Sequence, residues 1–189
     1  MAHNYYWSPE DEAGLEHLHL IESEAGTLAN GVVLRRFDDF SLRVHYFVQC
    51  DREWKTLKVE AGLLDSPGSR IALESDGEGH WRYESGSRLE ALDGCLDVDI
   101  MVTPYTNTLP IRRLGLDVGQ AAEIAVVYIS FPELDVSRMR QRYTRLEDRN
   151  GRQAYLYENV ETVFSAELVV DVLGVVIDYA KAFRRIWPR

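Results

Sequence analysis

The sequence lacks the features that would point to export, membrane insertion or nucleic-acid binding. Its first residues, MAHNYYWSPEDEAG, contain no basic segment followed by an apolar one, so we expect no signal peptide. No run of about 18 apolar residues occurs, so we expect no membrane span. Lys and Arg total 21 against 31 Asp and Glu, and the net charge of −10 argues against binding to nucleic acid or anionic lipid surfaces. We therefore expect a cytoplasmic protein of bacterial type.

Cysteines and catalytic signatures are also scarce. The two cysteines, Cys50 and Cys95, lie far apart, and without an export signal we expect reduced, buried thiols. There is no Gly-x-Ser-x-Gly, His-Glu-x-x-His or Cys-x-x-Cys motif and no phosphate-binding loop. His17 and His19 share a strand face, but a metal site would need a third ligand. We assign no catalytic residue, metal ligand or cofactor from these patterns.

What the sequence does contain is an alternating, strand-like pattern. The 189 residues fit one domain, 1–189, and 46% hydrophobic content allows a large core. In FSLRVHYFVQC, residues 40–50, every second residue from Phe40 to Cys50 is apolar, which is typical of a half-buried antiparallel strand. Residues 28–86 continue as a meander of short strands, with a hairpin at DGEG. We predict a mainly β fold of antiparallel strands.

The second half repeats this pattern. Residues 122–131 form a β-branched strand, and Asn150-Gly151 predicts a hairpin between 135–148 and 153–159. Residues 161–179 predict one or two strands with a break at Gly174. Little helix is expected: only YAKAFRRIW (179–187) and, weakly, MRQRYTRLEDR (139–149) have helical character.

Two aspartates offer the simplest catalytic hypothesis. Asp97 and Asp99 would share a strand face, about 6–7 Å apart, so they could act as an acid and a base. Alternatively, both accept hydrogen bonds from the following loop or from Arg112 and Arg113.

Aromatic residues suggest a different site. Tyr46, Trp54, Trp81 and Tyr83 are candidates for a pocket wall, because aromatic rings provide large apolar faces with polar tips. Core packing is the alternative for most of them. Trp81 and Tyr83 would share one face of a strand.

The segment Thr103–Leu114, TPYTNTLPIRRL, has an unusual composition. Pro104 and Pro110 exclude a regular strand because neither has an N–H group. Threonines and Asn107 can bond to nearby backbone, while apolar residues such as Tyr105 can anchor the path on a core. We predict a rigid, ordered loop across the end or side of a sheet, serving as a lid, a pocket rim or a plug. Arg112 and Arg113 could meet the aspartates or an anionic ligand.

The same region carries a family resemblance. LDGCLDVDIMVTPYTNTLPIRRLGLDVGQ and VVYISFPELDV, with DREWKT, GHWRY and VVDVLGVVIDYAKAFRR, resemble the bacterial "putative glycolipid-binding" family across nearly the whole chain. The resemblance implies a curved half-barrel or β-roll, similar in shape to envelope lipoprotein carriers and lipoglycan-binding lipoproteins. It implies no catalytic residues.

Three functions remain open at this point. The first is non-catalytic binding of an amphipathic lipid or glycolipid on the concave face of the sheet. Its contacts would come from Tyr46, Trp54, Trp81, Tyr83, Asp97, Asp99, Tyr105, Asn107, Arg112 and Arg113. The second is a hydrolase of a carbohydrate or lipid ester that uses the two aspartates. The third is a structural or interaction module whose concave face is filled by its own side chains.

Overall fold

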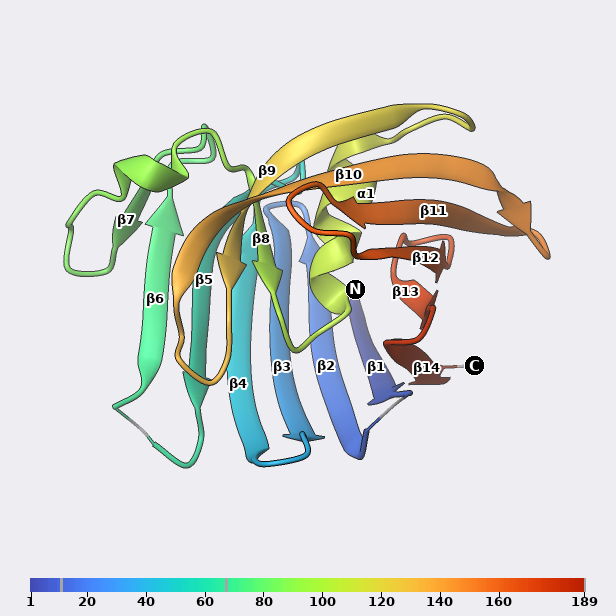
Figure 1. Ribbon diagram of the computed structural model, residues 1–189. Helices are drawn as coiled ribbons and strands as arrows, with labels where there is room; N and C mark the ends of the chain where they lie inside the picture. Colours follow the sequence, from blue (N-terminus) through green and yellow to red (C-terminus); the bar gives the residue numbers. More distant parts are fainter. Residues whose placement is uncertain (11, 67, 189) are drawn as a thin grey trace.

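The computed structural model describes residues 1–10, 12–66 and 68–188, and it is dominated by one large sheet (Figure 1). Fourteen strands form this sheet in the order β7-β6-β5-β4-β3-β2-β1-β14-β13-β12-β11-β10-β9-β8. Their bounds are β1 (Ala2–Pro9), β2 (Gly14–Ser23), β3 (Gly26–Arg36), β4 (Ser41–Cys50), β5 (Thr56–Leu63), β6 (Arg70–Ser75), β7 (Trp81–Tyr83), β8 (Asp97–Ile100), β9 (Ala121–Ile129), β10 (Val136–Arg149), β11 (Arg152–Asn159), β12 (Ser165–Val170), β13 (Val176–Tyr179) and β14 (Phe183–Trp187).

Two meanders make up the sheet. Strands β1–β7 form the first meander, strands β9–β14 form the second, and antiparallel pairing of β1 with β14 joins them. In Figure 1 the first meander runs vertically, and β9, β10 and β11 arch across its upper end. The sheet stays open because its edge strands, β7 and β8, are not paired with each other. This confirms the predicted mainly β half-barrel, with one addition: β8 pairs with β9 in parallel.

Local sequence signals account for most of these strands. On β4, the inward residues Leu42, Val44, Tyr46 and Val48 are buried, as the period of two predicts. The predicted hairpin at Asn150-Gly151 joins β10 to β11, and both turn residues have positive φ, 53° and 73°.

Three helices fall between β7 and β9: η1 (Glu90–Leu92), η2 (Tyr105–Asn107) and α1 (Thr108–Leu114). Thus the predicted loop at Thr103–Leu114 was wrong, because most of it is helical. Pro104 has helical torsions just before η2, and Pro110 is the third residue of α1. Both positions tolerate proline, because the first N–H groups of a helix need no partner within it. Gly115 ends α1 in the left-handed conformation, at φ 54°.

The predicted helical character near the C-terminus was also wrong. Residues 179–187 form the end of β13, a turn and β14, and residues 139–149 belong to β10. Pairing with neighbouring strands satisfies the backbone of both segments, and that tertiary contribution outweighs weak helix propensity.

Residues 97–114, which we call the plug segment, comprise β8, η2 and α1 and pack on the concave face of the first meander. Val98, Ile100, Tyr105 and Leu109 are buried in one core cluster with the inner face of the first meander. Ile111 packs instead into a second cluster with residues of β10–β14. The plug segment therefore joins the two meanders through their cores. Burying a Leu or Ile side chain in this way contributes roughly 1.5–3 kcal/mol.

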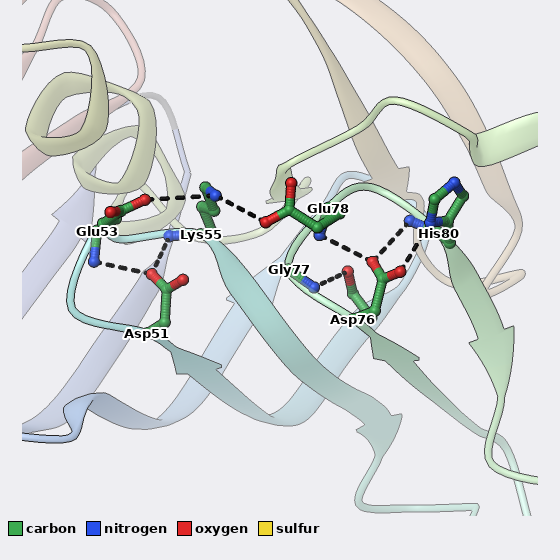
Figure 2. A network of polar contacts seen from close by, with 8 residues as sticks. Asp51, Glu53, Lys55, Asp76, Gly77, Glu78 and His80 are labelled. Atoms are coloured by element: carbon green, nitrogen blue, oxygen red, sulfur yellow. Dashed lines mark hydrogen bonds and ion pairs between the residues drawn. The ribbon is translucent and has the colours of Figure 1, made fainter.

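Acidic turns at one end of the first meander are held together by polar contacts (Figure 2). Asp51 accepts backbone hydrogen bonds in the β4–β5 turn, and Asp76 does the same in the β6–β7 turn. Lys55 Nζ lies 3.2 Å from a carboxylate oxygen of Glu78 and so links the two turns. The His80 side chain, with backbone N–H groups, lowers the pKa of Asp76 to about 2. These contacts order the rim of the sheet next to the plug segment.

Both cysteines are buried and unpaired, as the prediction of buried thiols without a disulfide requires. No helix among the described residues is long and apolar enough to cross a membrane.

Candidate functional site

A cavity of about 420 Å³ lies between the plug segment, the second meander and the end of β3. We call it the aromatic cavity. Its apolar lining comes from Phe37, Met101, Tyr128, Met139, Tyr157, Phe164, Tyr179, Ala182 and Phe183. Its polar lining comes from Arg35, Asp99, Thr103, Asn107, Asn159 and Lys181. An apolar wall with a few polar groups is the usual make-up of a small-molecule site.

Three rings build one wall of the aromatic cavity. Tyr157 lies on β11, Phe164 precedes β12 and Tyr179 ends β13, so neighbouring strands place them side by side. The ring centroids of Tyr157 lie 6.0 Å from Phe164 and 6.1 Å from Tyr179, with interplanar angles of 64° and 63°. Edge-to-face packing at these separations is favourable and fixes the orientation of the rings. The wall is therefore ordered before any ligand arrives.

Hydrogen bonds fix the polar side of the cavity. Asp99 accepts from Thr106 Oγ1 at 3.1 Å and from Gln141 Nε2 at 2.6 Å. Burial raises the pKa of Asp99, and these two bonds act in the opposite direction. Asn107 Oδ1 accepts from the Tyr143 hydroxyl at 2.9 Å. Neutral donors hold Asp99, so it can accept further hydrogen bonds from ligand hydroxyls.

Cationic side chains stand at another part of the same lining. The guanidinium carbon of Arg35 lies 4.8 Å from the ring centroid of Phe37 and 5.0 Å from that of Phe183. Its Nε donates to Glu12 at 2.9 Å. Lys181 comes from the turn between β13 and β14.

Behind the cavity lining, Thr103 bonds to a buried carboxyl group. The Thr103 hydroxyl donates to Glu16 Oε1 at 2.6 Å, and the Tyr46 hydroxyl donates to the same oxygen at 2.5 Å. Burial raises the pKa of Glu16 to about 7, although both hydrogen bonds oppose the rise. A Cβ at Gly31 would lie 2.1 Å from Tyr46 Cζ, so only glycine lets the ring cross β3 to reach β2. This cluster fastens the plug segment to the first meander.

The two predicted aspartates have separate environments. The Asp97 side chain is fully buried, and Arg113 donates to it through Nη2 at 2.6 Å and Nε at 3.1 Å. Burial raises the pKa of Asp97, and Arg113 lowers it. Only Asp99 lines the aromatic cavity. The alternative hydrogen-bonding role is thus what the structure shows: Arg113 binds Asp97, and Thr106 of the plug segment binds Asp99.

The remaining predicted residues are dispersed. Of the ten, Asp99 and Asn107 line the aromatic cavity. Tyr46 and Tyr105 are buried in the core, with ring centroids 6.5 Å apart. Trp81 is buried and donates its indole N–H to the Cys95 carbonyl at 2.8 Å.

Tyr83 lies partly exposed on the edge strand β7. Trp54 and Arg112 line a second cavity of about 570 Å³, with the Arg112 guanidinium carbon 5.0 Å from the Trp54 ring centroid. The rest of that lining is chiefly charged or polar: Glu22, Ser23, Glu24, Gly26, Thr27, Asp51 and Arg52. Such a lining suits an apolar ligand less well than the aromatic cavity does.

Sequence reasoning missed most of the aromatic cavity, including Arg35, Tyr157, Phe164, Tyr179 and Lys181. Their signal was weak: QAYLYEN has alternate tyrosines, but nothing in it indicates which distant residues they face. His17 and His19 do share a face, and both bond to Asn4 Oδ1, at 2.9 and 3.2 Å. Within the described ranges there is no group of three or more metal-ligating side chains.

Comparisons with known proteins agree with the fold. A family profile described as "Putative glycolipid-binding" matches residues 4–185. The crystal structure of a DUF1089 family protein from Pseudomonas aeruginosa is 38% identical and superposes with a TM-score of 0.80, covering 92% of each chain. Among curated proteins, none matches the sequence.

Proposed function

The chain belongs to the family described as "Putative glycolipid-binding", and from this premise we propose that it binds an amphipathic ligand, a lipid or glycolipid, in the aromatic cavity. The observation that carries the proposal is the division of the cavity lining. Aromatic and methionine side chains would contact an acyl chain or the apolar face of a sugar. Asp99, Asn107 and Asn159 would bond to hydroxyl groups.

The plug segment limits the space that such a ligand could occupy. It occupies the concave face of the first meander, so that part of the half-barrel is filled by the chain's own side chains. The aromatic cavity is the space left between the plug segment and the second meander. A volume of about 420 Å³ suits a head group or a short length of chain, so the rest of a long lipid would extend outside.

The geometry favours binding over hydrolysis. An acid and base pair must contact the same substrate. The Asp97 side chain has no exposed surface and forms an ion pair with Arg113, so it cannot contact a ligand in the cavity. Asp99 alone therefore borders the aromatic cavity, and the proposal assigns it to binding.

A thermal-shift panel of single-chain lipids and alkyl glycosides tests the proposal, with product analysis on the same mixtures. A ligand that binds the folded state raises the melting temperature by mass action. Ala182 lines the cavity, and Ala182→Trp should fill it and abolish the shift while leaving the polar residues in place. Ala121→Trp is the matched control, because Ala121 is exposed on β9 and does not line the cavity.

Binding that is lost in Ala182→Trp and kept in Ala121→Trp would support the cavity as the site. Equal shifts in both variants would place binding elsewhere. Product formation that disappears in Asp99→Asn would overturn the binding-only proposal in favour of an enzyme.

A further inference from the structure

We infer that Arg35 and Lys181 form a seat for an anionic group, so the ligand of the aromatic cavity is an anionic amphiphile carrying a carboxylate or a phosphate. This inference rests on the proposed function and narrows its ligand class. It is motivated by two cations in a lining that is otherwise aromatic, apolar or uncharged apart from Asp99.

Arg35 is held rigidly in place. Its guanidinium lies within 5.0 Å of two ring centroids, those of Phe37 and Phe183, and its side chain is only 16% exposed. Stacking on aromatic faces is a favoured environment for guanidinium. Phe37 follows β3 and Phe183 begins β14, so the pairing of β1 with β14 brings the second ring to Arg35. A guanidinium fixed in this way loses little freedom when it binds a ligand.

The free edge of Arg35 is the part suited to an anion. Its Nε donates to Glu12 at 2.9 Å, whereas its two terminal nitrogens have no hydrogen-bond acceptor among the described residues. Those nitrogens carry donors in the fixed fork that matches carboxylate and phosphate oxygens. Glu12 thus orients the guanidinium while leaving its outer edge available.

Lys181 adds a second, more mobile charge. Its backbone has φ 65°, and its N–H donates to Glu10 Oε2 at 3.1 Å, which fixes the turn. The other oxygen of Glu10 pairs with Arg184 at 2.7 Å. Within the described ranges, the Lys181 ammonium has no ion-pair partner, although its residue lines the cavity. An ammonium on a flexible stem can adapt to different anions.

The opposite side of the cavity suits a different part of the ligand. Asp99 would repel an anion, while it and Asn107 can bond to hydroxyl groups. The chain's net charge of −10 also repels anions at a distance. An anionic ligand therefore needs local cations at the seat, and salt should weaken its binding.

Isothermal titration with single-chain amphiphiles of equal length tests the inference, at low salt and below their micelle concentrations. The probes are dodecyl phosphate, dodecanoate, neutral dodecyl maltoside and dodecyltrimethylammonium, with inorganic phosphate alone as a further arm. We expect both anionic amphiphiles to bind about tenfold more tightly than the maltoside, which corresponds to about 1.4 kcal/mol. The cationic probe should bind most weakly.

Charge variants locate the effect. Lys181→Gln should weaken the binding of dodecyl phosphate several-fold and leave the affinity for dodecyl maltoside unchanged. Arg35→Lys keeps the charge but removes the fork, so it should weaken the anionic probes as well. Arg36→Gln removes an equal charge from the opposite, exposed face of β3. It should change neither the affinity for the anionic probes nor that for dodecyl maltoside.

The outcomes separate the two proposals. Equal binding of neutral and anionic amphiphiles, unchanged in Lys181→Gln, would overturn the anion seat and leave the proposed function standing. Binding of no amphiphile would overturn the proposed function. If inorganic phosphate binds as tightly as dodecyl phosphate, Arg35 and Lys181 would still form an anion site. The proposal that the ligand is an amphiphile would then be contradicted.

Discussion

Replacing Glu16 with Gln should remove a large pH dependence from the stability of this protein. Burial raises the pKa of Glu16 from its ordinary value of 4.5 to about 7. The folded state therefore holds a proton that the unfolded state releases above about pH 4.5. The stabilisation from this proton is complete below that pH and is lost as the pH rises to about 7.

The magnitude follows from the two pKa values. Their difference of about 2.5 corresponds to about 3.4 kcal/mol, at 1.36 kcal/mol for each pKa unit. Part of the loss falls below pH 5, which leaves about 2.5 kcal/mol between pH 5 and pH 8. Gln cannot titrate, so the free energy of unfolding of Glu16→Gln minus that of the wild type should rise by about 2.5 kcal/mol over this interval.

Urea unfolding at several pH values, followed by tryptophan fluorescence, measures this difference directly. Glu24→Gln is the control, because it makes the same substitution at an exposed glutamate outside the buried contacts of Glu16 with Tyr46 and Thr103. A Glu16→Gln curve that stays parallel to the wild type from pH 5 to pH 8 would refute the buried, protonated carboxyl. Thr103 and Tyr46 would then donate their hydrogen bonds to an ionised Glu16 carboxylate over this pH range.

Three substitutions and one labelling experiment probe the plug segment and the core. Arg113→Ala leaves the fully buried Asp97 carboxylate without its cation, so it should lower the free energy of unfolding by about 3–5 kcal/mol. Arg112 is exposed and contacts the Trp54 ring, so Arg112→Ala should lower it by only about 0.5–1 kcal/mol. Thermal or urea melts measure both variants. Gly31→Ala places a Cβ against the Tyr46 ring and should destabilise the fold by at least about 2 kcal/mol in urea titration. Burial raises the pKa of Cys50 to about 12 and that of Cys95 to about 11, so neither thiol should react with a disulfide reagent at pH 8 until urea unfolds the chain.

Each of these expectations has its own counter-result. Gly68→Ala serves as the control for Gly31→Ala, since a Cβ there meets no atom within 4 Å, and equal melts of the two variants would deny the close approach. Equal melting temperatures of the Arg112→Ala and Arg113→Ala variants would mean that the ion pair of Arg113 with Asp97 is not buried. Rapid thiol labelling of the native protein would show that the core opens near Cys50 or Cys95.

Local patterns predicted many of the strands, but they predicted neither β14 nor the plug segment. Alternation in β4 and the Asn150-Gly151 turn are short-range signals, and both predicted their elements correctly. The plug segment depends on long-range burial instead. Its two prolines excluded a strand, yet helix start positions accept proline, so the composition fitted a loop and a helix equally.

The candidate site was the least predictable feature. Arg35 meets Phe183 only because β1 pairs with β14, a contact between opposite ends of the chain. Tyr157 and Tyr179 face one space only after β11, β12 and β13 have paired in register. A single sequence carries no record of such pairings. Asn107 was found because it belongs to the segment of unusual composition, and Asp99 was found because it forms an Asp-x-Asp pair with Asp97.

Photo-crosslinking with a diazirine-labelled dodecyl phosphate, read by peptide mass spectrometry, tests the binding site most directly. If the ligand occupies the aromatic cavity, labelled peptides should contain Tyr157, Phe164 and residues 179–183, and Ala182→Trp should abolish the labelling. The outer face of β3 carries partly exposed Leu28 and Val32, which provide an internal comparison. Labels confined to that outer face, with the cavity peptides unmodified, would contradict a ligand site in the aromatic cavity.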